Sequence, residues 1–267
     1  MTDHDSVVLT LPDLDKGALA PLLDGSVLAI RIPGFTAPAE AAHIAGRLAA
    51  HPSLSAYRNT AELVRVGESH YETHDADGTT NRQALTEYLS NAERLMAEIR
   101  AACAPYESPL DMLWQGLDAS YGLERARIGD RPMFAGVCRV FPEGSELLPH
   151  NDRLARDAPG LPLGLELEAQ LAANIYLQVP EQGGELELWD LRPDEEELAA
   201  WRAPGSTYGA DRALLPPPAC ELRVAAGDLV LIDATRLHAV SRQVRGARIG
   251  LSCFLGARRG RPFVCWS

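Results

Sequence analysis

The hydrophobic pattern of this chain changes near residue 132, and this change constrains the fold more than any other feature. Before it, residues 37–50 and 81–103 repeat apolar side chains at the spacing of an amphipathic helix. A third helix is predicted to open at Ser108-Pro109, with Ser108 as its cap and Asp111 near the positive end of the helix dipole. The first 130 residues are therefore expected to be mainly helical.

Beyond residue 132 the chain divides into short segments bounded by Gly, Pro or Asp, and many alternate apolar with polar residues as strands do. Such a run of strands after a helical part predicts an α+β fold, with a β-sandwich or barrel braced by helices. Residues 191–218 are too long for a plain hairpin loop and indicate a functional or covering insert. The predicted strands are 133–141, 169–179, 185–189, 221–224, 228–233, 238–244 and 248–255.

Composition narrows the class of protein. The chain has 267 residues and no repeat or linker-like stretch, so a single domain over 1–267 is the simplest prediction. A net charge of -12 argues against nucleic acid and against an anionic membrane surface. The five widely spaced cysteines and the absence of a signal-like or membrane-spanning apolar run predict a reduced, cytoplasmic protein.

One H-x-D triplet, His150-Asn151-Asp152, follows a predicted strand and the turn Pro142-Glu143-Gly144. A second histidine, His238, follows another predicted strand. Two imidazoles and one carboxylate on one face of a metal are the arrangement that Fe(II) oxygenases use. The set contains no thiolate, which disfavours a structural zinc site. The alternative is a loop histidine beside a solvated aspartate, since a lone H-x-D is a weak signal.

Arg248 opens a predicted strand ten residues after His238. On a strand, Arg248, Gly250 and Ser252 share one face. An arginine there could hold the far carboxylate of a dicarboxylic acid with two parallel hydrogen bonds, with Gly250 leaving room and Ser252 donating one more. The alternative for Arg248 taken alone is a surface arginine on a strand.

The order H-x-D, GGELEL, GDLVLIDATRLHAV and R-x-x-x-S resembles the 2-oxoglutarate/Fe(II) dioxygenase superfamily over about residues 133–256. The segments VCRVFPEGSELLPHND and YLQVPEQGGELELW and the final CWS are similar to a bacterial subgroup. That subgroup contains radical halogenases of indole alkaloids and of free amino acids, with hydroxylase relatives. The resemblance implies a double-stranded β-helix (jelly-roll) core over 131–258, buttressed by helices in 1–130 and followed by a C-terminal tail at 259–267.

By the same resemblance, His150, Asp152 and His238 are the iron ligands, and Arg248 binds 2-oxoglutarate with help from Ser252. The halogenases have glycine or alanine where this chain has Asp152, and the vacated position accepts chloride. The resemblance therefore implies a hydroxylase that uses Fe(II), 2-oxoglutarate and O₂ on a small molecule such as an amino acid or a natural-product intermediate, giving succinate and CO₂. The alternatives are desaturation, cyclisation or halogenation, hydroxylation of a protein side chain, and a non-enzymatic β-sandwich binding module.

Other candidate residues carry weaker signals. His70 and His74 lie in a polar stretch that could be a lid, although solvated loop histidines are the simpler interpretation. Arg139 could meet a substrate carboxylate, but pairing with an acidic residue is the expected role. Trp266 could cover a cavity or pack on the surface. The pair Gly183-Gly184 is interpreted as a hairpin turn with a structural role.

Overall fold

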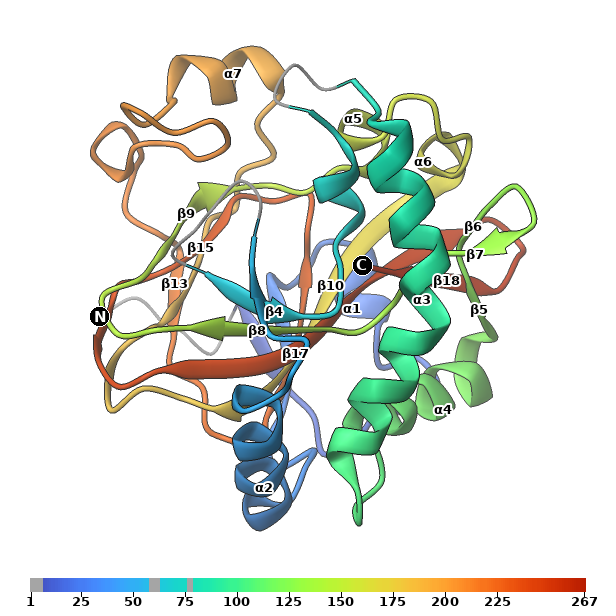
Figure 1. Ribbon diagram of the computed structural model, residues 1–267. Coiled ribbons are helices and arrows are strands. Elements are labelled where there is room, and N and C mark those ends of the chain that lie inside the picture. Colours follow the sequence, from blue (N-terminus) through green and yellow to red (C-terminus); the bar gives the residue numbers. More distant parts are fainter. Residues whose placement is uncertain (1–6, 58–62, 76–78) are drawn as a thin grey trace.

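The computed structural model describes residues 7–57, 63–75 and 79–267, and over these ranges the protein has a mixed α+β fold (Figure 1). The long helices are α2 (Pro38–Ala49), α3 (Arg82–Cys103) and α4 (Pro109–Tyr121). The short helical segments are α1 (Ala20–Leu23), η2 (His70–Thr73), α5 (Leu154–Asp157), α6 (Leu163–Glu166), α7 (Glu195–Ala200) and η3 (Arg212–Leu214).

The larger sheet of the described chain has the strand order β1-β2-β14-β10-β17-β8-β4-β3, with β18 and β5 added beside β17. A smaller sheet has the order β13-β12-β15-β9. The strands of the larger sheet are β1 (Val8–Thr10), β2 (Ala29–Ile32), β3 (Ser55–Ala56), β4 (Val64–Val66), β5 (Leu123–Arg125), β8 (Val137–Phe141), β10 (Leu167–Gln178), β14 (Leu229–Asp233), β17 (Arg248–Arg258) and β18 (Phe263–Trp266). Those of the smaller sheet are β9 (Leu147–His150), β12 (Leu186–Leu188), β13 (Cys220–Leu222) and β15 (His238–Val240). Two separate pairs are β6 (Arg127–Ile128) with β7 (Arg131–Pro132), and β11 (Gln182–Gly183) with β16 (Gln243–Arg245).

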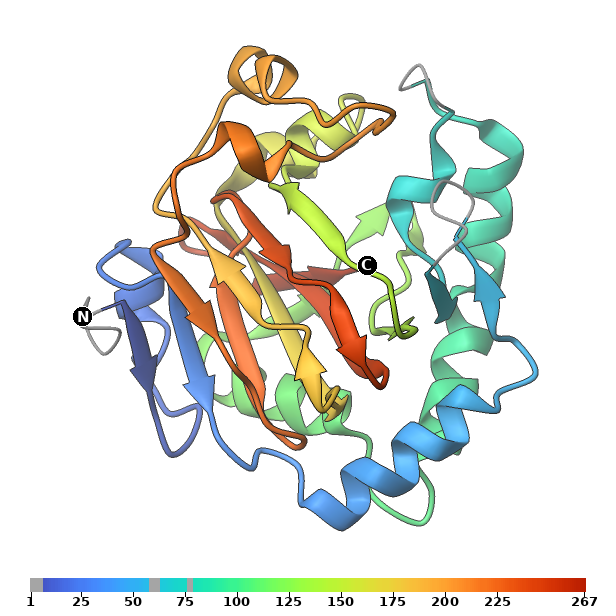
Figure 2. The same cartoon turned by 90° about the vertical axis from the view of Figure 1, so that its left-hand side faces the viewer.

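Alternate residues of the central strands face two different cores, as the period of two in a strand requires. On β14, Leu229 and Leu231 pack in the large core that includes the buried faces of α2, α3 and α4. Val230 and Ile232 face the opposite way and pack with residues of the smaller sheet. The helices therefore cover one face of the larger sheet and the smaller sheet covers the other, as the two views show (Figures 1 and 2).

Both amphipathic helices of the N-terminal half agree with the sequence prediction. On α2 the buried face contains Ala41, Ile44 and Leu48. On α3 it contains Met96 and Ile99, which are less than one tenth exposed. The hydrophobic pattern predicted these helices to within two residues at each end because each one buries its apolar stripe against the same core.

The N-terminal half also contains strands, which the prediction of a mainly helical region missed. Strand β2 pairs antiparallel with β14, and β1 pairs parallel with β2, so the larger sheet is built from both halves of the chain. Short strands such as β2 have too few residues to show a clear period of two. Their pairing depends on a partner about 200 residues away in the sequence.

Two C-terminal segments also differ from expectation. The strand predicted at 238–244 is two strands, because the chain leaves the smaller sheet after Val240 and β16 then pairs with β11. The residues expected in a tail at 259–267 include β18, which pairs with β17 and is buried. A partner strand on each side stabilises this segment, since β5 pairs with its other edge.

The start of α4 lies where it was predicted, but the cap differs. Pro109 occupies the first turn, and Asp111 accepts hydrogen bonds from Arg100 Nε and Nη2, both at 2.8 Å. The Ser108 hydroxyl is buried and makes no hydrogen bond to a helix amide, so the predicted side-chain cap is wrong. The Ser108 carbonyl accepts the first helical hydrogen bond from Met112 instead.

The pair Gly183-Gly184 has the structural role expected of it, although it belongs to the β11–β16 pairing and not to a simple hairpin turn. Both glycines have positive φ, and a Cβ at Gly183 would lie 2.0 Å from the Arg242 carbonyl oxygen. We expect Gly183→Ala to lower the free energy of unfolding by on the order of 1–3 kcal/mol, measured by urea denaturation. Gly160→Ala is the control, because no atom lies within 4 Å of its added Cβ. Equal stability of the two variants would contradict this account.

None of the helices in the described part of the chain is long and apolar enough to cross a membrane.

Candidate active site

A cavity of about 500 Å³ lies between the two sheets. Its floor comes from the inward-facing residues of β8, β10 and β17, and the smaller sheet supplies the opposite wall. The insert at 191–218 lines one side of the cavity through Leu198, Arg202 and Tyr208. Figure 2 shows this segment at one end of the sheets. This volume is typical of sites for small molecules.

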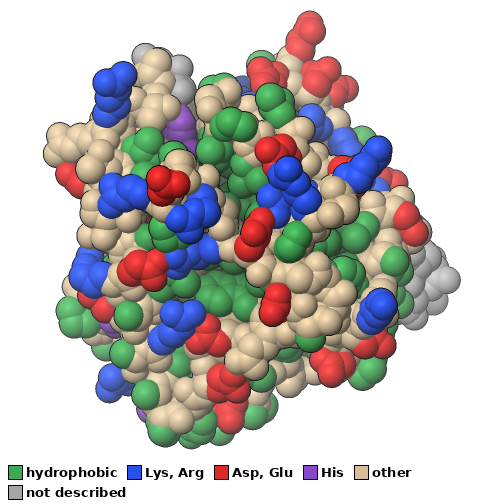
Figure 3. Space-filling model, turned by 90° about the vertical axis from the view of Figure 1, so that its right-hand side faces the viewer, with side chains coloured by type: hydrophobic (Ala, Val, Ile, Leu, Met, Phe, Trp, Pro, Cys, Tyr) green, Lys and Arg blue, Asp and Glu red, His purple; other side chains and the backbone are tan. Residues whose placement is uncertain are grey.

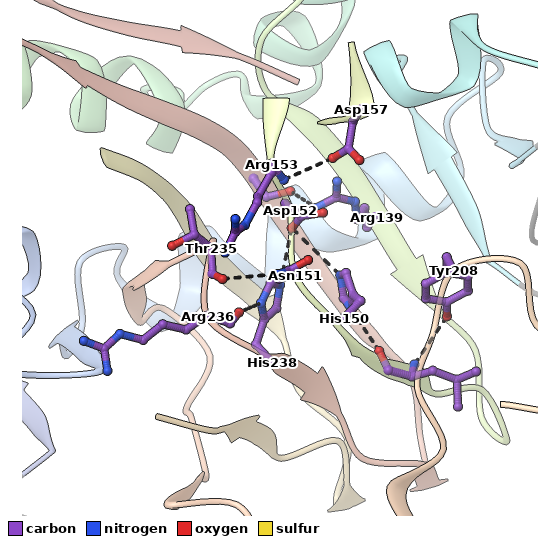
Figure 4. A network of polar contacts seen from close by, with 12 residues as sticks. Arg139, His150, Asn151, Asp152, Arg153, Asp157, Tyr208, Thr235, Arg236 and His238 are labelled. Carbon is purple, nitrogen blue, oxygen red and sulfur yellow. Dashed lines mark hydrogen bonds and ion pairs between the residues drawn. The ribbon is translucent and has the colours of Figure 1, made fainter. Parts of the chain in front are cut away.

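His150, Asp152 and His238 come together at this cavity (Figure 4). The two histidines are direct partners in the β9–β15 register, and their ring centroids are 4.4 Å apart. Asp152 Oδ2 lies 3.4 Å from His238 Nε2 and 3.9 Å from His150 Nε2. One ligand atom from each residue lies within 4.8 Å of the others, and within the described ranges this is the one such group of three or more.

Backbone carbonyls orient both imidazoles. His150 Nδ1 lies 2.8 Å from the Leu148 carbonyl oxygen, and His238 Nδ1 lies 2.9 Å from that of Arg236. Because a carbonyl oxygen only accepts, the proton must reside on Nδ1 in each ring. The Nε2 lone pairs then face Asp152 and are available to a metal.

The turn that carries Asp152 is fixed by hydrogen bonds to the insert and to the β14–β15 loop. The Asp152 amide donates to the Ala234 carbonyl at 2.8 Å. The buried Asn151 amide nitrogen donates to the Thr235 carbonyl at 3.3 Å (Figure 4) and to the Pro193 carbonyl at 3.1 Å. Asn151 Oδ1 accepts from Arg156 at 2.6 Å. The middle residue of the triplet therefore positions its two neighbours.

The electrostatics of His150 and Asp152 suit a divalent cation. Burial and, as a smaller effect, the neighbouring His238 together lower the pKa of His150 to about 4, so the ring is neutral near pH 7. Burial alone would raise the pKa of Asp152, but His150, His238 and Arg139 outweigh burial and hold it below its usual range. Near neutral pH, His150 therefore presents a neutral nitrogen and Asp152 presents a carboxylate.

Arg248 is buried on the floor of the same cavity, not on the surface. Its guanidinium carbon lies 4.5 Å from the Tyr176 ring centroid and 5.2 Å from that of Phe141. Nη2 donates to the Tyr176 hydroxyl at 3.3 Å, whereas Nη1 is buried without a hydrogen-bond partner among the described residues. An unpaired buried donor is costly, so this geometry suits an anionic ligand that would accept from Nη1.

Gly250 and Ser252 line the cavity beside Arg248, as the strand period predicted. Ser252 Oγ accepts a hydrogen bond of 2.7 Å from Arg139 Nη1. The expectation that Arg139 pairs with an acidic residue is wrong for the described part of the chain, where it makes no ion pair. Its Nε donates instead to the Tyr57 hydroxyl at 2.9 Å.

The other candidates divide between cavity and surface. His70 is buried and lines the cavity, and Trp266 is buried there too, whereas His74 does not line it. Residues 76–78 of the possible lid lie outside the described residues. Tyr176, which contacts Arg248, was not identified from the sequence. It lies across from Gly250 in the β10–β17 register, and no local pattern in the sequence reveals that pairing.

These residues fit the cofactors of a non-haem iron oxygenase. Two imidazole nitrogens and one carboxylate oxygen are a donor set that Fe(II) accepts with further positions open. The unpaired Arg248 donor fits the distal carboxylate of a 2-oxo dicarboxylic acid. The three metal-ligand candidates and Arg248 line the same cavity, which leaves space for a substrate beside the dicarboxylic acid.

Curated proteins similar to this chain include a hydroxylase and a dioxygenase. An L-gamma-glutamyl-L-propargylglycine hydroxylase of Streptantibioticus cattleyicolor is 34% identical over 165 residues, which is 60% of this chain and 59% of that protein. An L-isoleucine 3(1)-dioxygenase of Pantoea ananatis is 31% identical over 127 residues, 45% of this chain and 42% of that protein. The chain thus spans less than two thirds of the length of either relative.

Among solved structures, the fold is shared with an N-substituted L-amino acid dioxygenase from Burkholderia ambifaria AMMD in complex with alpha-KG. Its TM-score is 0.65 at 18% identity, and the match covers 94% of this chain and 90% of that one.

The family model described as the carrier-protein-independent halogenase WelO5 matches residues 14–266, nearly the whole of the chain. The chain therefore belongs to the WelO5 family within the 2-oxoglutarate/Fe(II)-dependent dioxygenase superfamily, whose cofactors are Fe(II) and 2-oxoglutarate.

Proposed function

We propose that this protein is an Fe(II)- and 2-oxoglutarate-dependent hydroxylase of a small molecule, an amino acid or a natural-product intermediate. The observation that carries the proposal is the carboxylate of Asp152 beside the Nε2 atoms of His150 and His238. In this proposal the three residues are the iron ligands, and Arg248 binds the distal carboxylate of 2-oxoglutarate with help from Ser252.

The bound iron and 2-oxoglutarate would supply the activation of O₂, with release of succinate and CO₂ and oxidation of one C–H bond of the substrate. The chain's own residues hold and orient the reactants. His150 and His238 present Nε2 because backbone carbonyls hold the Nδ1 protons. Arg248, on the floor of the cavity, fixes one end of the cosubstrate, and the insert limits access of water from one side.

The substrate class is supported by the relatives, two of which are named for oxidation of amino acids or their derivatives. Desaturation, cyclisation and hydroxylation of a protein side chain use the same cofactors and remain alternative outcomes of the product analysis. Nucleic acid is disfavoured by the net charge of -12 and by the interspersed acidic and basic side chains on the face in Figure 3.

We also propose a single domain with a double-stranded β-helix core, in a cytoplasmic protein. A double-stranded β-helix core is supported by two facing sheets with the site between them. A single domain is supported by the large core, which joins the N-terminal helices to the strands of the second half. A cytoplasmic location is supported by the five cysteines, all of which are free and buried.

The proposal is tested by anaerobic titration with Fe(II) and 2-oxoglutarate, which should produce the weak visible charge-transfer band of the ternary complex. Addition of O₂ and a set of small molecules should then reveal compounds that accelerate succinate formation. A protein that gives neither the band nor succinate is not an oxygenase of this type.

Asp152 separates hydroxylation from halogenation, because the halogenases that this chain resembles have glycine or alanine at this position. We expect the native protein to hydroxylate even in high chloride or bromide, since a carboxylate ligand fills the position that a halide would take. Asp152→Gly should lose most hydroxylation and gain at most slight halogenation, because the outcome also depends on where the substrate radical lies. Mass spectrometry of products formed with and without halide measures both effects.

Asp152→Asn is the matched control for this experiment, since it keeps the size of the side chain and removes its charge. It should reduce hydroxylation without opening a position for halide. A chlorinated product from the unmodified protein would show that the interpretation of Asp152 is wrong.

A further inference from the structure

Arg139 is a second arginine on the floor of the cavity, and it forms no ion pair with the described residues. It lies on β8 directly across from Gly250 of β17, whose other cross-strand neighbour is Tyr176. Arg248 is two residues from Gly250 along the same strand. The small Gly250 therefore separates two arginines that face the same space.

The Arg139 guanidinium is held in place but keeps one nitrogen available. Nε donates to the Tyr57 hydroxyl at 2.9 Å, and Nη1 donates to Ser252 Oγ at 2.7 Å. Nη2 makes no hydrogen bond to the described residues. Figure 4 shows Arg139 beside Asp152, so the guanidinium lies near the proposed metal site.

The carboxylates around the cavity floor are already engaged. Glu72 binds Arg65 at 2.5 Å and Asp157 binds Arg156 at 2.7 Å. Asp152 lies beyond ion-pair distance from Arg139 and would bind the metal. With a divalent metal, the Asp152 carboxylate, a dianionic cosubstrate and the Arg248 cation, the charges of the cofactor site cancel. The charge of Arg139 is left over in a confined space, where an uncompensated charge is unfavourable.

We infer that Arg139 binds the carboxylate of the organic substrate, which restricts the substrates to small carboxylic acids such as α-amino acids with a free carboxylate. This inference rests on the proposed function and specifies its substrate class. Planar guanidinium groups bind carboxylates through parallel hydrogen bonds, and Nη2 with the adjacent Nη1 can offer them. Apolar side chains such as Leu147, Leu154 and Leu186 line the cavity and suit an aliphatic remainder.

The test compares acids with their carboxamides on the protein loaded with Fe(II) and 2-oxoglutarate. Anaerobic calorimetry and thermal shift measure binding of the proteinogenic L-amino acids, and of leucinamide, isoleucinamide and valinamide beside the matching acids. We expect at least one acid to bind, and its carboxamide to bind on the order of 30-fold more weakly or worse, as loss of a buried charged partner predicts. Succinate release gives the same comparison as kcat/KM.

Variants then assign the effect to Arg139. Arg139→Gln should weaken binding of the acid by a similar factor and abolish the preference over the carboxamide. Arg139→Lys should retain part of the preference, because an ammonium keeps the charge without the planar geometry. Arg127→Gln, in the separate β6–β7 pair away from the cavity, is the control and should behave as the native protein.

The charge-transfer band of the Fe(II)–2-oxoglutarate complex reports folding and cofactor binding of each variant. The inference is supported if Arg139→Gln gives a normal 2-oxoglutarate titration but no longer binds the acid more tightly than its carboxamide. The inference is overturned if Arg139→Gln weakens 2-oxoglutarate binding as much as Arg248→Leu does. It is also overturned if the native protein binds acid and carboxamide equally, or binds no amino acid while its charge-transfer band is normal. Loss of the band in the native protein would instead reject the proposed function.

Discussion

Replacing His150 or His238 with alanine is expected to abolish turnover. Each variant leaves one imidazole and one carboxylate, which cannot hold Fe(II) in the facial arrangement proposed here. Losing only an outer hydrogen-bond partner of a metal ligand costs roughly 10- to 100-fold in metal affinity or activity, so losing the ligand itself should cost more than about 100-fold. The measurements are Fe(II) binding under anaerobic conditions and succinate release with O₂.

His51→Ala is the control for this experiment, because His51 lies at the end of α2 and does not line the cavity. It should bind Fe(II) and form succinate at native levels. Circular dichroism of all three variants distinguishes a lost ligand from a lost fold. Near-native succinate formation by either His150→Ala or His238→Ala would remove the basis for the proposed metal site.

Arg248→Leu is expected to raise the KM for 2-oxoglutarate sharply while leaving Fe(II) binding nearly unchanged. The guanidinium is buried between Tyr176 and Phe141, and its Nη1 has no partner in the described chain. Losing a charged hydrogen-bond partner in such a site costs on the order of 2–5 kcal/mol, which is roughly 30-fold to several thousand-fold in affinity. Titration of the charge-transfer band with 2-oxoglutarate measures the loss directly.

Arg248→Lys should restore only part of the affinity, since an ammonium cannot form two parallel hydrogen bonds with a carboxylate. The matched control is Arg245→Leu, three residues earlier on β16, where an exposed arginine pairs with the exposed Glu181. Such a surface ion pair contributes about 0–1 kcal/mol, and its loss should leave the 2-oxoglutarate titration unchanged. An unchanged titration in Arg248→Leu would mean that another residue binds the carboxylate.

Local patterns in the sequence were sufficient to predict the long helices and most strands of the second half. The apolar positions of 37–50 and 81–103 match the buried faces of α2 and α3. The spacing of Arg248, Gly250 and Ser252 correctly predicted that all three face the same space. These features depend only on the period of a helix or a strand, which a single segment contains by itself.

Features that depend on a distant partner could not be predicted in this way. β2 belongs to the larger sheet because β14 lies beside it, and the residues expected to be a tail form β18 because β17 and β5 flank them. The hydrogen bonds of Arg139 to Tyr57 and Ser252 join residues 82 and 113 positions apart, so no local signal distinguished them from a surface ion pair.

The amino-acid sequence by itself determined the order of the chemistry-bearing residues: His150 and Asp152 first, then His238, then Arg248 and Ser252. It also determined that each lies at or near a strand, because the flanking residues alternate and the turns are marked by Gly and Pro. Only the tertiary structure decided that His150 and His238 are register partners and that Arg248 lacks one hydrogen-bond partner. It alone placed Arg139 without an acidic partner among the described residues. The physical reason is that strand pairing and burial arise between segments far apart in the chain, whereas periodicity and turn chemistry arise within one segment.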